Sequence, residues 1–209
     1  MDVRFINPFL DGTLEVLKTM AGIDAIPAKP ALKLDNSAYG DASGIIGLTG
    51  EAVGSLAVSF TEKCICRIVT AMLGERHDEI DAGVIDAVGE LTNMISGAAR
   101  TKLEKQGLKV YAAIPTVVYG PGHRITHILK SPSIVIPFST AHGSFFADVC
   151  IRASEREERA GVESGVLNVR TEQMAQAPRQ AQPARPQPAQ PPPPPPREDL
   201  SHLSPEERF

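Results

Sequence analysis

Several residue types are scarce in this chain of 209 residues, and each scarcity excludes a class of protein. There is no tryptophan, and the only cysteines are Cys64, Cys66 and Cys150. An odd cysteine count with one C-x-C pair in a helical segment fits neither a disulfide framework nor a zinc site. No apolar run approaches the roughly 20 residues that cross a bilayer, and residues 1–18 lack a signal-peptide core. We therefore expect a cytoplasmic protein with no membrane partner.

Concentrated positive charge is also absent. Lysine and arginine number 21 against 25 acidic residues, which gives a formal net charge of −4. Because nucleic acids attract proteins with basic blocks, we expect no nucleic-acid partner. The sequence contains neither a P-loop nor a G-x-G-x-x-G turn after a strand, and it has no G-x-S-x-G nucleophile motif. Nucleotide-dependent and serine-hydrolase chemistry are therefore disfavoured.

The composition changes abruptly near residue 152. Residues 1–151 have the apolar content of one globular domain, and a domain of about 150 residues buries enough surface to fold without staples. Residues 152–173 form a charged connector, and residues 174–209 are rich in proline, a composition that predicts disorder. Near the end, Ser204-Pro205-Glu206-Glu207 is typical of a helix start, so this segment is either a short docking helix or an ordinary frayed terminus.

Hydrophobic periodicity within residues 1–151 predicts an α+β fold, a mainly antiparallel sheet packed with a long central helix and two further helices. The first helix is expected at 7–21, with Asn7 as N-cap and Pro8 at its first position. Strands are expected at 31–35, 43–49, 54–60, 110–119, 125–129, 133–138 and 144–151. The second helix is expected from 61 to 74 and the long one from 78 to 106. The turn 50–52 predicts a hairpin between two of the strands.

The long helix presents two different faces. At about 100° per residue its apolar positions share one arc of roughly 120°, as expected of a helix packed on a core. The opposite arc carries Asp86, Glu90, Asn93, Gly97, Arg100 and Glu104. Glu90 and Asn93 are three residues apart and are therefore neighbours on the helix surface. A glycine on this face costs roughly 1 kcal/mol relative to alanine, which suits the close approach of another molecule. On its own, however, an E-x-x-N pair is more often a solvated helix face.

Other candidate sites are weaker. His123 and His127 would share one face of a strand, but no third ligand is evident, so we expect no metal site. Cys64 lies near a helix start, where its pKa could fall, although packing as a small apolar residue is the more frequent role.

The motif Glu90-Leu91-Thr92-Asn93-Met94-Ile95-Ser96-Gly97 resembles that of the CheC/CheX/FliY chemotaxis phosphatase family. The segment around Pro115 and Gly120, and the first helix ending Met20-Ala21-Gly22, also match this family. The likeness extends from Asn7 to about Ile151. CheC-type members resemble an internal duplication with two E-x-x-N helices, whereas the first helix here has Glu15 and Lys18 and no such motif. The chain is therefore more similar to CheX. One departure is Ala98, where many relatives have asparagine.

This resemblance implies a function and a site. Similar proteins hydrolyse the aspartyl phosphate of a CheY-type response regulator, which supplies the acyl phosphate, a magnesium ion and a lysine. Asn93 would orient the attacking water and Glu90 would pair with that lysine, with Asp86, Gly97 and Arg100 binding the partner. The resemblance implies no cofactor bound by the chain itself. It does imply a homodimer that pairs through its sheets. Two alternatives remain open: a non-catalytic module that binds a regulator or a flagellar-switch component, and a scaffold in which the proline-rich tail is the working part.

Overall fold

The structure, a computed structural model, describes residues 3–129 and 131–154. In this part the chain has the predicted α+β fold, in which helices pack on an antiparallel sheet. The predictions for the tail at 174–209, and for the connector beyond residue 154, lie outside the described residues. Among the helices of the described part, none is both long and apolar enough to cross a membrane.

The sheet is antiparallel at every pairing between its strands. The helices are α1 (Val3–Ala21), α2 (Glu62–Leu73) and α3 (Ala82–Lys105), and the strands are β1 (Ile26–Pro27), β2 (Ala31–Lys33), β3 (Ala42–Gly50), β4 (Ala52–Phe60), β5 (Val110–Ala112), β6 (Thr116–Tyr119), β7 (Ser133–Thr140) and β8 (Gly143–Ala153). Their order is β1-β7-β8-β4-β3-β5, with β2 also paired to β7 and β6 to β3. The hairpin predicted at 50–52 is confirmed by the pairing of β3 with β4.

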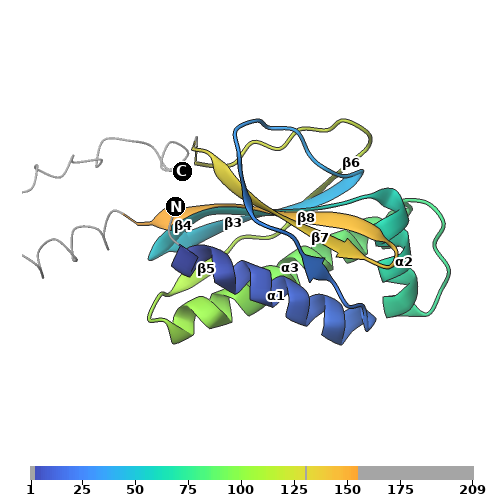
Figure 1. Ribbon diagram of the computed structural model, residues 1–209, viewed down its shortest axis with the longest axis horizontal. Coiled ribbons are helices and arrows are strands. Elements are labelled where there is room, and N and C mark those ends of the chain that lie inside the picture. The colour runs from blue at the N-terminus through green and yellow to red at the C-terminus, as the bar shows by residue number, and fades with distance from the viewer. Residues whose placement is uncertain (1–2, 130, 155–209) are drawn as a thin grey trace, which may run out of the picture. The chain divides into compact units, whose positions relative to one another are not determined.

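Across residues 3–129 and 131–154, the helices cover one face of this sheet. Figure 1 shows α1 and α3 side by side on that face, while the connections 34–41 and 120–129 lie over the other. The core fills the layer between helices and sheet, where Phe9, Leu17, Leu91 and Ile95 have no exposed surface. Each such side chain stabilises the fold by about 1.5–3 kcal/mol relative to an exposed position.

The first helix begins earlier than its sequence predicts. It starts at Val3, so Asn7 is not an N-cap and Pro8 lies inside the helix. Proline cannot donate a hydrogen bond to the preceding turn. Phe5 and Ile6 are nevertheless buried against the core, and this burial offsets the lost bond. Apolar packing therefore decides the start of α1, and the capping signal at Asn7 does not.

One strand prediction is also wrong, and a second is confirmed only in part. Residues 125–129 form no strand. In the described part, one isolated β-bridge lies outside the strands, and it joins Ser37 to Arg124. The amide of Ile125 bonds the carbonyl of Asn36 at 2.8 Å, so this connection is extended but not part of the sheet. The strand predicted at 110–119 is divided into β5 and β6, because residues 113–115 leave the sheet between them.

Helix α3 lies unusually close to its neighbours at two glycines. A Cβ atom added to Gly44 of β3 would lie 2.0 Å from the Thr92 hydroxyl, and one added to Gly12 of α1 would lie 3.0 Å from the amide nitrogen of Ala99. Any larger residue at these positions would push α3 away. The two glycines therefore set the distance of α3 from the sheet and from α1.

We expect Gly44→Ala to lower the free energy of unfolding by about 3 kcal/mol, because the added methyl overlaps Thr92 and has no space to relax into. Gly47→Ala is the matched control on the same strand. There the nearest atom is the end of the flexible Ile128 side chain at 3.2 Å, and we expect a change of less than about 1 kcal/mol. Urea denaturation of both variants measures the difference, and equal stabilities would contradict this account of the α3 position.

Candidate functional site

Helix α3 starts at a well-defined cap. The side chain of Asp81 accepts a hydrogen bond of 2.8 Å from the amide of Val84, and His77 Nδ1 lies 2.8 Å from its other oxygen. The Val84 amide and then His77 lower the pKa of Asp81, so the carboxylate that the cap requires is favoured. Because Asp81 is the N-cap, α3 begins at Ala82 and not at the predicted residue 78.

The two predicted faces of α3 are present. The residues predicted on the inner arc are buried, apart from Ala98, which is half-buried; they are Val84, Ala87, Val88, Leu91, Ile95 and Ala99. On the outer arc Asp86, Glu90 and Asn93 are exposed, whereas Gly97 and Arg100 are half-buried. The motif's own Thr92 and Ser96 are fully buried, so its hydroxyl groups face the interior and only Glu90 and Asn93 present polar groups outward.

A groove of about 600 Å³ runs beside Glu90 and Asn93. One wall is α3 and the other is the connection between β5 and β6. The lining residues are Ile85, Asp86, Gly89, Glu90, Asn93, Ala113, Ile114, Pro115 and Val117. At Gly89 an added Cβ would touch Val117 at 3.5 Å, so this glycine keeps the groove deep between the two walls.

The lining of this groove limits its chemistry. Its polar side chains are two carboxylates, Asp86 and Glu90, and one amide, Asn93. Serine, cysteine and lysine, which often act as nucleophiles in covalent catalysis, are not among the lining residues. The groove can bind a cation through its two carboxylates and orient a hydrogen-bonding molecule through the amide of Asn93.

Comparison with known proteins finds relatives of a single family. The family model described as "Chemotaxis phosphatase CheX" matches residues 42–139. The chain is 33% identical over 136 residues to the "CheY-P phosphatase CheX" of Thermotoga maritima, a match that covers 63% of this chain and 88% of that relative. The chain belongs to the CheX family.

Solved structures place this CheX-family chain among close structural relatives. The chemotaxis protein CheX of Desulfovibrio desulfuricans is 47% identical, with a TM-score of 0.66, over 71% of this chain and 99% of that one. A chain in the crystal structure of the CheX–CheY–BeF3–Mg2+ complex from Borrelia burgdorferi is 26% identical, with a TM-score of 0.59, over 71% and 97% of the two chains.

The structure of this CheX-family chain divides the predicted site residues between two hollows. Asp86, Glu90 and Asn93 lie together in the groove, whereas Gly97 and Arg100 line a neighbouring hollow. Sequence reasoning did not find Ile114, whose side chain is 88% exposed at the edge of the groove. One indication of Ile114 was present in the sequence: an isolated isoleucine that precedes a proline, in the connection between the short strands β5 and β6.

The histidines and the cysteine considered from the sequence have structural contacts. His123 Nε2 lies 2.7 Å from the Ser43 hydroxyl, and His127 Nδ1 lies 2.8 Å from the Ser55 hydroxyl, so each ring fastens a connection to the sheet. Cys64 is fully buried, and this burial raises the pKa of its thiol. The packing role of Cys64 is therefore favoured over the reactive one.

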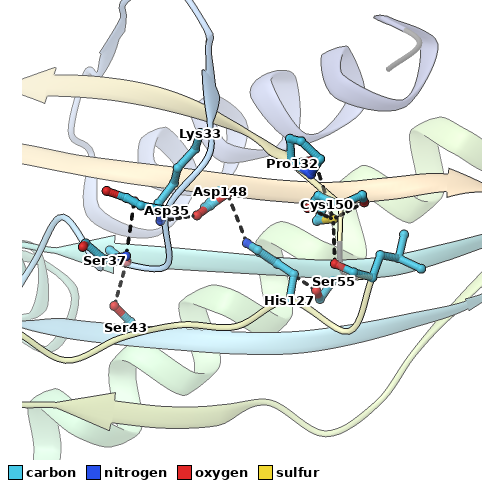
Figure 2. A network of polar contacts seen from close by, with 12 residues as sticks. Lys33, Asp35, Ser37, Ser43, Ser55, His127, Pro132, Asp148 and Cys150 are labelled. Atoms are coloured by element: carbon cyan, nitrogen blue, oxygen red, sulfur yellow. Dashed lines mark hydrogen bonds and ion pairs between the residues drawn. The ribbon is translucent and has the colours of Figure 1, made fainter.

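A buried ion pair lies on the sheet face opposite the helices. Figure 2 shows Lys33 and His127 on either side of Asp148. Lys33 Nζ is 2.6 Å from one carboxylate oxygen and His127 Nε2 is 3.1 Å from the other, and all three side chains are less than a tenth exposed. The lysine contact is a hydrogen bond, but the histidine contact lacks hydrogen-bond geometry and is an electrostatic one.

These partners determine the ionisation of Asp148. Burial alone would raise its pKa, but His127, Lys33 and Ser133 outweigh burial and hold the pKa below its usual value. A carboxyl group with a lowered pKa in the folded state stabilises the fold fully above its unfolded pKa of about 3.9. That contribution is lost as the pH falls through the lower, folded value.

We expect Lys33→Met to lower the free energy of unfolding by about 3 kcal/mol or more at pH 7, because it leaves a buried carboxylate without its main partner. Lys18→Met is the matched control, since Lys18 pairs with Asp24 at the same kind of distance, 2.7 Å, but in solvent. Lys18→Met should lower the free energy of unfolding by less than about 1 kcal/mol. Asp148→Asn should lose less stability below pH 4 than the wild type, because it has no carboxylate to protonate. Denaturation curves of the three variants at pH 7 and pH 3 measure these differences. Equal behaviour of the three variants would disprove the assignment.

Proposed function

We propose that this chain is a protein phosphatase that hydrolyses the aspartyl phosphate of a CheY-type response regulator. The observation that carries the proposal is the groove that joins Glu90 and Asn93 on an exposed face of α3 and has no serine, cysteine or lysine in its lining. The relative from T. maritima is named a CheY-P phosphatase, and the relative from B. burgdorferi was solved with CheY, BeF3 and Mg2+. Both support a regulator as the second molecule.

In this proposal Asn93 positions the attacking water. The amide of asparagine both donates and accepts hydrogen bonds and carries no charge, so it can hold a water molecule without repelling the phosphoryl group. The water oxygen forms a bond to phosphorus as the bond to the regulator's aspartate breaks. The aspartate leaves as a carboxylate, and the water proton passes to the phosphate product or to solvent.

Glu90 has a binding role in the same proposal. It lies one helical turn before Asn93 and, with Asp86, gives the groove a negative charge. Such a site attracts a cationic side chain, and the lysine that contacts the phosphoryl group in the regulator is the partner that we assign to it. Gly97 lets the regulator approach the helix backbone, and Arg100 contacts it further along. The magnesium ion belongs to the regulator.

The energy required is within reach of positioning alone. A 100-fold acceleration corresponds to about 2.7 kcal/mol, and holding the reactants in the correct geometry can contribute up to roughly 7–11 kcal/mol. Phosphoryl transfer through a loose transition state needs mainly positioning and charge stabilisation. Proton abstraction by a general base in the groove is therefore not required.

We expect Asn93→Ala to reduce kcat for phosphate release at least about 100-fold with little change in KM, because the water loses its orienting group. We expect Glu90→Ala mainly to raise KM, because it removes a contact to the bound regulator. The decay of phosphorylated regulator, followed over a range of regulator concentrations, separates the two effects.

Glu75→Ala removes an exposed carboxylate outside the groove and should leave both constants unchanged. Unaltered turnover by Asn93→Ala would disprove the assigned mechanism. If the wild-type chain bound the regulator without shortening its phosphorylated lifetime, the chain would be a non-catalytic binding module of the same fold.

A homodimer paired through the sheet is a further part of the proposal. The sheet edge formed by β1 and β2 carries the exposed apolar residues Ile26 and Leu32, followed by Leu34. An exposed strand edge of this kind pairs readily with another chain. We expect light scattering at micromolar concentration to give twice the mass of one chain, and Leu32→Lys to reduce it. A mass of one chain for the wild type would disprove the dimer.

A further inference from the structure

A second hollow, of about 490 Å³, lies next along α3 from the groove. Arg100 and Glu104 line it from the helix, and Lys109 and Tyr111 line it from the opposite wall. Asn93 and Arg100 are seven residues apart, which is two turns and about 10 Å along a helix. Their side chains therefore point to nearly the same side of α3, and the two hollows follow one another along the helix.

Within residues 3–129 and 131–154, the positive charges of this second hollow have no side-chain partner. Arg100 Nε is buried and makes no hydrogen bond, and its guanidinium has no ion pair in the part of the chain that the structure describes. Lys102 differs, since it is paired with Glu15 at 2.7 Å. Lys109 uses only its backbone, which exchanges hydrogen bonds with Glu51. Glu104 is the one acid among the described residues that line the hollow, and Arg100 and Lys109 outnumber it.

Gly97 leaves this guanidinium accessible. A Cβ added at Gly97 would have the Arg100 terminal nitrogen, at 3.9 Å, as its nearest neighbour. Space above the helix backbone and an unpaired guanidinium are thus adjacent. A half-buried arginine is suited to bidentate hydrogen bonding with a carboxylate, and burial of its Nε without a partner costs free energy that such a ligand would recover.

We propose that the hollow of Arg100, Lys109 and Tyr111 is a docking subsite for an acidic side chain on the surface of the response regulator. This inference rests on the proposed function, because it places the regulator on the groove beside it. The surface then has opposite charge at its two ends, with Asp86 and Glu90 at one and Arg100 and Lys109 at the other. Opposite charges across an interface fix the orientation of a partner, so the regulator binds in the one direction that brings its phosphoryl group to Asn93.

The test measures the affinity for a CheY-type regulator from the same genome activated with beryllofluoride and Mg2+, together with kcat and KM for its phosphorylated form. We expect Arg100→Glu to weaken binding about tenfold and to raise KM by a similar factor with kcat unchanged. Lys109→Glu, at an exposed position, should act in the same direction, and it guards against a folding defect in the Arg100 variant. The affinity of the wild type should fall more steeply with salt than that of Arg100→Glu.

Arg67→Glu is the matched control, because it makes the same charge change at an exposed position on α2. Equal losses of affinity in Arg67→Glu and Arg100→Glu would overturn the subsite, since they would reflect net charge alone. An affinity of Arg100→Glu and Lys109→Glu within twofold of the wild type would also overturn it. A failure of the proposed function gives a different result: the wild type would bind the activated regulator without hydrolysing its phosphate. The affinities of the variants for the activated regulator would then still decide whether the subsite exists.

Discussion

The close contact of α3 with strand β3 is the constraint on which the site depends. Gly44 brings the strand against Thr92, and Gly12 brings α1 against Ala99 on another side of the same helix. Neither glycine lies in the groove. A rotation of α3 by one residue, about 100°, would nevertheless turn Asn93 away from the groove. The direction of the polar pair is therefore determined by backbone packing on the buried side of the helix.

Strand β3 also positions the other wall of the groove. Both β5 and β6 pair with β3, and the connection between them holds Ile114 and Pro115 opposite α3. The amide of Ala113 bonds the carbonyl of Gly47 at 2.9 Å, which fastens this connection to the same strand. One strand thus sets both walls. On its far face, hydrogen bonds from Ser43 to His123 and from Ser55 of β4 to His127 fasten the covering connection.

The sequence predicted those features that are local in the chain. Helical periodicity alone placed Glu90 and Asn93 on the exposed face of α3, because burial repeats every turn. The wall formed by Ile114 lies more than 20 residues away and reaches α3 only through strand pairing. That Arg100 Nε is buried without a hydrogen bond among the described residues was likewise hidden, since it depends on which distant side chains the fold brings near it. At Asn7 and Pro8 a local capping signal was overruled by the burial of Phe5 and Ile6, a tertiary effect.

A rigid and chemically sparse groove is what the proposed reaction requires. When the partner brings the phosphoryl group, the metal ion and a cation, the phosphatase contributes geometry, and a displacement of 1 Å can cost about 100-fold in rate. A flexible helix carrying the same Glu90 and Asn93 would bind the partner and lose most of the acceleration. The glycine contacts that hold α3 to the sheet fix Asn93 relative to the fold. In the proposed mechanism, the opposite charges along the outer face of α3 then fix the regulator relative to Asn93.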